Sequence, residues 1–141
     1  MLIKEKELKK FFNLSYGEKA PSREEWESLY NMQVKFIDPT QEKNGIDAYI
    51  KAQDGLIKRC DDIYLESHSI AINKNIAFVE WTMGLKIKGL EFLYDGTTRL
   101  IFDEEGKVKE HRDYFDFCSG TFGNVPVIGA FFRWLYSKFV D

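Results

Sequence analysis

The sequence predicts an α+β fold in which N-terminal helices pack on one face of a curved antiparallel sheet. Helix-like segments occupy most of the chain up to residue 60, and four β-rich segments joined by short turns occupy residues 63–117. Strands joined by such turns pair antiparallel as a meander, and helices that precede a run of strands cover one face of the sheet. The length of 141 residues suits one domain, which we expect to span residues 1–141 with a C-terminal helical tail at about 125–141.

The composition excludes several classes of function. The net charge is −3 and the basic residues are scattered, so we expect no nucleic-acid partner. Aromatic residues make up 16% of the chain, a high share that predicts a ring-filled core or an aromatic pocket. Cys60 and Cys118 lack Cys-x-x-Cys spacing and clustered histidines, so we expect neither a disulfide framework nor a bound metal. Because the chain has neither a run of eighteen apolar residues nor a signal-like N-terminus, we expect no membrane span and a cytoplasmic location.

The first part of the chain carries three helix signals. A charged segment over residues 4–12 has apolar residues at helical spacing. Ser22, followed three residues later by a glutamate, is a capping box and predicts a second helix that runs through Tyr30. A third helix is expected to follow Gly45 and to end near Cys60, because apolar residues recur at helical spacing between them.

The strands follow from β-rich segments and their turn residues. A short strand at 34–37 ends at Asp38 and Pro39, because proline cannot donate a ladder hydrogen bond, and a polar loop comes next. The four longer strands are expected at residues 63–72, 76–88, 90–102 and 108–117. In the last strand His111, Asp113 and Phe115 share one face, whereas Tyr114 lies on the other face.

The C-terminal segment predicts one more helix, opened by Val125 and Pro126. Its apolar residues recur at helical spacing from Ile128 to Phe139, and Trp134 adds bulk on the opposite side. Three roles remain open for this helix. It could pack on its own domain, it could cover the pocket mouth or join an oligomer interface, or it could lie on a membrane surface.

Short motifs along the chain carry a family resemblance through their order and spacing. These are Phe36-Ile37-Asp38-Pro39, Gly45, Val79-Glu80-Trp81-Thr82-Met83, Asp95-Gly96, Leu100 to Val108, and His111-Arg112-Asp113-Tyr114-Phe115-Asp116. Together they resemble the nuclear transport factor two-like superfamily and, within it, the SnoaL-like branch related to ketosteroid isomerases and limonene epoxide hydrolases. The resemblance implies a cystatin-like cone: a curved antiparallel sheet with N-terminal helices on its concave face, a C-terminal helix and a deep apolar pocket. It also implies a homodimer through the outer sheet face.

The resemblance assigns roles to single residues. Asp38 falls where ketosteroid isomerases carry the carboxylate that moves a proton beside a carbonyl, while Thr98 stands at the position of their protonated aspartate. Tyr16 lies near the position of their helix-one tyrosine. Asp113 lies in a segment similar to the one that supplies the acid of limonene epoxide hydrolases. Their Arg-x-Asp pair is replaced by Trp81 and Met83, which disfavours epoxide hydrolysis.

We therefore expect a pocket for a small hydrophobic carbonyl or cyclic molecule. If the protein is an enzyme, we expect isomerase, cyclase or dehydratase chemistry without a metal or organic cofactor. Asp113 would act as acid or base and Asp38 as its partner, with Tyr114 or His111 orienting one of them. The residues expected to contact the ligand are Trp81, Met83, Thr98, Phe115, Phe36 and Tyr16.

A non-catalytic alternative uses the same residues. Asp38 could only brace the turn before Pro39, and Asp113 could only pair with Arg99 or Arg112. The cone would then hold a small ligand, or serve as a dimerisation module, without chemistry.

Overall fold

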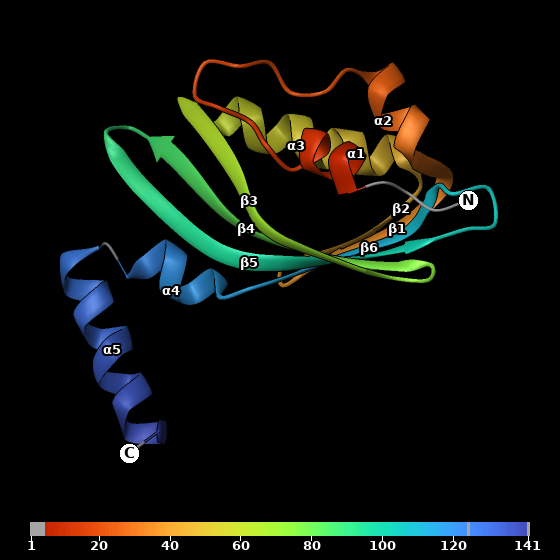
Figure 1. Ribbon diagram of the computed structural model, residues 1–141. Coiled ribbons are helices and arrows are strands. Elements are labelled where there is room, and N and C mark those ends of the chain that lie inside the picture. Colours follow the sequence, from red (N-terminus) through yellow and green to blue (C-terminus); the bar gives the residue numbers. More distant parts are fainter. Residues whose placement is uncertain (1–4, 124, 141) are drawn as a thin grey trace.

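The computed structural model describes residues 5–123 and 125–140, and it confirms the α+β class. One six-stranded, curved sheet has the order β2-β1-β6-β5-β4-β3, and helices α1, α2 and α3 lie in its concave side (Figure 1). The strands are β1 (Tyr30–Asp38), β2 (Gln41–Asn44), β3 (Asp62–Asn73), β4 (Ile76–Ile87), β5 (Leu90–Phe102) and β6 (Val108–Phe115). The helices are α1 (Glu5–Phe11), α2 (Arg23–Leu29), α3 (Ile46–Arg59), α4 (Phe117–Phe122) and α5 (Pro126–Val140).

The four long strands form the expected antiparallel meander from β3 to β6. The sheet then continues with β1, which pairs parallel to β6, and ends with β2, which pairs antiparallel to β1. The polar loop expected after Pro39 is thus partly an edge strand. All four residues of β2 are exposed, so no hydrophobic alternation marks this strand in the sequence.

The capping box at Ser22 is confirmed, because its side chain accepts from the Glu25 backbone N–H and the Glu25 carboxylate accepts from the Ser22 N–H. The helix that follows ends one residue earlier than expected. Tyr30 adopts an extended backbone and starts β1, where it lies beside Val108 of β6. Its ring is 1% exposed, so burial against the sheet decides the conformation of Tyr30 over its helical spacing.

The hydrophobic core fills the space between the helices and the concave face. Its largest fully buried side chains include Tyr30, Tyr49, Leu8 and Leu100. Rings pack edge-to-face here, as where Trp26 contacts Tyr49 with ring centroids 5.3 Å apart. The high aromatic content therefore builds the core, and part of it also lines the cavity described below.

The chain leaves the sheet through α4, a short helix that the sequence did not predict. The Asp116 carboxylate accepts from the Ser119 backbone N–H and caps this helix. The expected C-terminal helix is present as α5, which packs against α4 and projects away from the sheet (Figure 1). Within the described residues, no helix has the length and apolar character needed to cross a bilayer.

Candidate functional site

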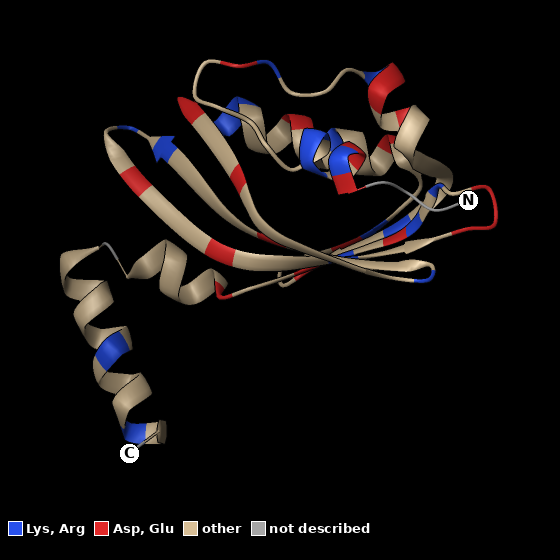
Figure 2. Ribbon diagram, viewed as in Figure 1, with Lys and Arg blue, Asp and Glu red and all other residues tan. Residues whose placement is uncertain are grey.

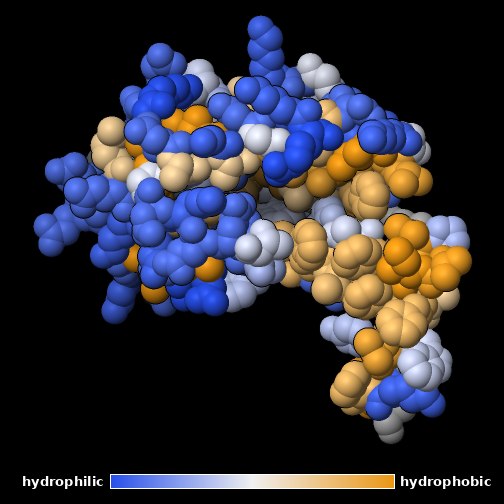
Figure 3. All heavy atoms as spheres, turned by 180° about the vertical axis from the view of Figure 1, so that it is seen from behind, coloured by the Kyte–Doolittle hydropathy of each residue, from blue (hydrophilic) through white to orange (hydrophobic). Residues whose placement is uncertain are grey.

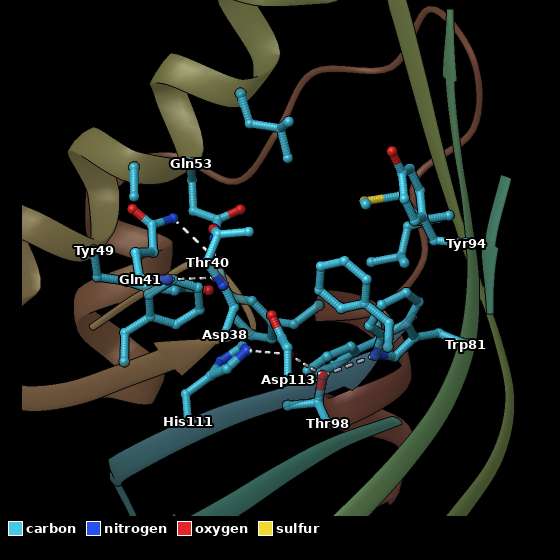
Figure 4. Close-up of a pocket in the computed structure, with 18 of the residues that line it drawn as sticks. Asp38, Thr40, Gln41, Tyr49, Gln53, Trp81, Tyr94, Thr98, His111 and Asp113 are labelled. Carbon is cyan, nitrogen blue, oxygen red and sulfur yellow. Dashed lines mark hydrogen bonds and ion pairs between the residues drawn. The ribbon is translucent and has the colours of Figure 1, made fainter. Parts of the chain in front are cut away.

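A cavity of about 240 Å³ lies between the concave face of the sheet and helices α1 and α3. Most of its wall is aromatic or aliphatic and comes from both layers. The apolar lining includes Phe11, Phe12, Trp26, Phe36, Leu56, Leu65, Met83, Leu85, Phe115 and Phe117. Polar side chains form a minority of the lining, and they come from β5 and β6, from the turn between β1 and β2, and from α3 (Figure 4). This pattern suits an apolar ligand with one or two polar groups.

Asp113 is the centre of a hydrogen-bonded chain on the sheet side of the cavity. Its Oδ1 atom accepts from the Thr98 hydroxyl at 2.5 Å and contacts the His111 Nε2 atom at 2.7 Å. The Thr98 hydroxyl in turn accepts from the Trp81 indole N–H at 2.8 Å. The side chain of Asp113 is 17% exposed, and its second oxygen points into the cavity (Figure 4).

Two buried tyrosines extend this chain behind His111. The Tyr49 hydroxyl donates to the Tyr30 hydroxyl at 3.3 Å, and the Tyr30 hydroxyl lies 2.7 Å from His111 Nδ1. Burial raises the pKa of both tyrosines well above the ordinary value, so both keep their protons. Because Tyr30 accepts from Tyr49, its own proton points to Nδ1, and the proton of a neutral His111 ring lies on Nε2, toward Asp113.

Local strand geometry explains how these groups meet. His111 and Asp113 are two residues apart on β6 and therefore project from the same face. Thr98 on β5 lies directly opposite Asp113 in the antiparallel ladder. Trp81 on β4 lies opposite Gly96, and a Cβ on Gly96 would come within 2.5 Å of the indole ring. Because Gly96 has no side chain, the Trp81 indole can lie against the backbone of Gly96 and reach Thr98.

Asp38 also lines the cavity, but its carboxylate is engaged by the turn between β1 and β2. Its Oδ1 atom accepts from the backbone N–H groups of Thr40 and Gln41 and from the Thr40 hydroxyl, at 2.7, 3.0 and 2.7 Å. Its Oδ2 atom accepts from the Gln41 side-chain amide at 3.1 Å. Both oxygens of Asp38 thus stabilise the turn that precedes β2, as the non-catalytic alternative expects.

The structure brings most of the predicted site residues together. Trp81, Met83, Thr98, Phe115, Phe36, Asp38, His111 and Asp113 all line the cavity. Asp113 does not pair with the two arginines considered from the sequence. Arg99 forms an ion pair with Glu110, and the Arg112 guanidinium lies 5.1 Å from the ring centroid of Tyr114.

Tyr114 and Tyr16 lie outside the cavity. Tyr114 is 44% exposed on the opposite face of β6, since it is one residue away from Asp113. Tyr16 lies in the loop after α1, where its ring packs against Tyr64 at 4.9 Å and its hydroxyl donates to Glu91 at 3.3 Å. Neither tyrosine can therefore orient a cavity carboxylate in this structure.

Sequence reasoning did not assign Tyr30, Tyr49, Gln53 or Arg59 to the site. Tyr30 and Tyr49 reach His111 across the core, and no local spacing relates residues so far apart in the chain. Gln53 and Arg59 lie on α3 and line the cavity, and Figure 4 shows Gln53 on the helix side. Among the described residues, no cluster of three His, Cys, Asp or Glu side chains could hold a metal ion.

The curved sheet, its enclosed helices and the aromatic cavity define a member of the nuclear transport factor two-like superfamily. More narrowly, a family model for the SnoaL-like domain matches residues 9–111, and the chain belongs to this family. The matched segment ends at His111, so it leaves out Asp113, α4 and α5. No curated protein matches the chain.

Solved structures with the same fold include three bacterial proteins. One, from Jannaschia sp., is described as a SnoaL-like polyketide cyclase; it is 15% identical, with 69% of this chain and 74% of that chain covered and a TM-score of 0.62. A nuclear transport factor two-like protein from Exiguobacterium sp. is 20% identical over 68% and 86% of the chains, with a TM-score of 0.60. A protein with a ketosteroid isomerase-like fold from Catenulispora acidiphila, in complex with trimethylamine, is 15% identical over 66% and 74%, also with a TM-score of 0.60. These similarities establish the fold.

Proposed function

We propose that the cavity binds a small hydrophobic or cyclic carbonyl compound and that Asp113 transfers a proton to or from it. The reaction would be an isomerisation, a cyclisation or a dehydration, each of which requires a proton to move beside a carbonyl or hydroxyl group. A polyketide cyclase is among the proteins of the same fold, and ring closure by carbon–carbon bond formation begins with such a proton transfer.

The observation that carries this proposal is the asymmetric environment of the Asp113 carboxylate. Oδ1 is held by Thr98 and His111, and Oδ2 points into an apolar cavity (Figure 4). The two hydrogen bonds orient the carboxylate, which leaves Oδ2 as the atom that takes or returns a proton. His111 is a positioning residue in this scheme, because its Nε2–H remains a donor to Oδ1 throughout.

A base beside a carbonyl also needs a donor for the oxygen that becomes negative in the transition state. The side-chain amide of Gln53 projects from α3 toward the carboxylate across the cavity (Figure 4). Arg59 lines the same wall, and its guanidinium forms no hydrogen bond or ion pair with another side chain among the described residues. We assign Gln53 and Arg59 as candidate partners of the substrate carbonyl oxygen.

The test uses a probe ketone, 2-tetralone, in heavy water. Proton NMR follows exchange of its acidic C–H positions for deuterium with wild-type protein, Asp113→Asn and Glu80→Gln. Asparagine keeps an acceptor oxygen for Thr98 and His111 but cannot act as a base, so exchange should fall by about 10²-fold or more. Glu80 is exposed on β4 and gives a matched change of charge away from the cavity. Equal exchange by wild type and Asp113→Asn would remove Asp113 from the mechanism.

The non-catalytic alternative is favoured by one specific observation, the engagement of Asp38 by its turn. A catalytic pair of carboxylates in the cavity would need Asp38 to give up hydrogen bonds with Thr40 and Gln41. Binding without chemistry would appear as a small molecule retained in native mass spectrometry that the protein leaves unchanged on prolonged incubation.

We also propose a homodimer that forms through the convex face of the sheet. Phe78 and Tyr114 are each 44% exposed on strands of this sheet, so they could be covered by a second copy. Sedimentation velocity tests the proposal. The dimer should weaken in Phe78→Ser, and a monomer at all concentrations would contradict it.

A further inference from the structure

Helix α5 carries a large apolar surface that its own domain leaves uncovered. Val127 and Phe139 are 81% and 84% exposed, and Phe131 and Trp134 are each 55% exposed. We call these four side chains the α5 apolar surface. In Figure 3 hydrophobic colour gathers over the C-terminal helices, while hydrophilic colour dominates the other end of the molecule. Exposed apolar surface of this extent marks a binding surface in a folded protein.

The two charged side chains of α5 are both basic, while Asp116 and Asp141 flank residues 117–140 in the sequence. Residues 117–140 contain Arg133 and Lys138 and no aspartate or glutamate, although the whole chain has a net charge of −3 (Figure 2). Pairing of α5 with the α5 of a second copy would bring the four cations of the two helices together, and within α5 no acidic side chain offsets them. An anionic lipid surface supplies the missing negative charge and accepts apolar side chains at the same time.

The aromatic content and the length of α5 also fit a lipid surface. Trp134 and Tyr136 are of the residue types that concentrate at the boundary between headgroups and acyl chains. A helix of 15 residues is roughly 22 Å long, shorter than the ~30 Å hydrocarbon core, so α5 can lie in the interface but is too short to span it.

We propose that α5 binds the surface of an anionic phospholipid bilayer by inserting the α5 apolar surface between the headgroups. The position of α4 connects this surface with the cavity, because Phe117 at the start of α4 lines the cavity and α4 carries α5. Docking on lipid would thus hold the cavity near the phase in which hydrophobic molecules concentrate. This proposal does not depend on the chemistry assigned to Asp113.

The protein carries its own reporter for this interaction. Trp26 and Trp81 are 9% and 4% exposed, whereas Trp134 is 55% exposed, so quenching of tryptophan fluorescence by acrylamide reports mainly on Trp134. Vesicles of phosphatidylcholine mixed with phosphatidylglycerol should shift the emission to shorter wavelength and protect it from acrylamide. Vesicles of phosphatidylcholine alone should have a weaker effect, and added salt should reduce the binding to the mixed vesicles.

Variants locate the binding surface while they keep the reporter. Phe131→Ser combined with Phe139→Ser should weaken co-sedimentation with the mixed vesicles by more than about tenfold. Lys138→Gln should weaken it by about fivefold, because each cation near an anionic surface adds attraction. The matched control is Met32→Ser, which removes a 59% exposed apolar side chain from β1 and should bind the vesicles like the wild type.

Three outcomes would overturn the proposal. The emission and sedimentation could be unchanged by anionic vesicles, or Met32→Ser could lose as much binding as the double variant. Alternatively, sedimentation velocity without lipid could show an oligomer that the double variant abolishes, in which case a second copy covers α5. Circular dichroism of each variant checks that the fold is retained.

Discussion

Gly96 provides the space in which the Trp81 indole lies. Replacing Gly96 with alanine should destabilise both the sheet and the hydrogen bonds that connect Trp81 through Thr98 to Asp113. The added Cβ would lie 2.5 and 2.7 Å from two ring carbons of Trp81 and 2.9 Å from the carbonyl oxygen of Tyr114. The strand ladder fixes the backbone on both sides of Gly96, so the indole has to move. Its movement would break the 2.8 Å hydrogen bond from the indole N–H to Thr98.

The magnitude follows from three contributions. Overpacking of a core position costs about 1–3 kcal/mol. An indole N–H left buried without its acceptor costs roughly another 1–3 kcal/mol. Alanine recovers about 0.5–1 kcal/mol because glycine is unfavourable inside a strand. We therefore expect Gly96→Ala to lower the free energy of unfolding by about 1–5 kcal/mol, a large part of the ~5–15 kcal/mol typical of a domain.

Urea unfolding followed by circular dichroism measures this change, and Gly55→Ala serves as its control. Gly55 lies inside α3, where the nearest neighbour of an added Cβ is the flexible end of Arg59 at 3.6 Å. Alanine there should stabilise the protein by roughly 0.5–1 kcal/mol through helix propensity. A Gly96→Ala protein with the unfolding midpoint of the wild type would refute the argument that Gly96 makes room for Trp81.

Three further substitutions or measurements test other parts of the structure. Burial raises the pKa of Tyr30 and Tyr49, so their contribution to stability is complete below pH of about 10 and is lost at higher pH. Above pH of about 10, the free energy of unfolding of Tyr49→Phe, measured with urea, should therefore fall less steeply with pH than that of the wild type, by up to ~1.4 kcal/mol per pH unit. An unchanged slope would contradict this. Asp38→Ala should lower the free energy of unfolding by about 1–3 kcal/mol. Asp38→Asn should lower it by less, because asparagine keeps an oxygen that can accept three of the four hydrogen bonds. Equal losses would argue against the role of Asp38 in stabilising its turn. Cys118 is exposed, whereas burial raises the pKa of the Cys60 thiol. A disulfide reagent should therefore modify Cys118 at least about tenfold faster than Cys60. A single fast phase for both thiols would argue against the burial of Cys60.

The central part of the site was predictable because strand parity is local. His111 and Asp113 were assigned to one face of the last strand from their spacing alone, and the structure places both on the cavity side. The same parity already separated Tyr114 from them. The prediction of Tyr114 as a site residue was based on its phenol group, although its position on the strand places it on the face opposite to Asp113.

Other features depend on contacts that no local pattern encodes. Tyr30 fits a helical spacing, yet it begins β1 because β6 lies beside it. The strand β2 is polar throughout and exists because β1 offers it a free edge. The short helix α4 is different, because its Asp116 cap is a local contact with Ser119, but glycine and serine in this segment indicate a loop.

By itself, the sequence determined the α+β class, the order of the long strands and the shared face of His111 and Asp113, because hydrophobic period and turn chemistry act between near neighbours. Only the tertiary structure decided which partners the polar groups find. It engages Asp38 in its own turn, brings Tyr30 and Tyr49 to His111, and leaves α5 uncovered. Hydrogen-bond partners and uncovered surfaces depend on elements that are distant in the chain, so they become defined only when the curved sheet packs on its helices.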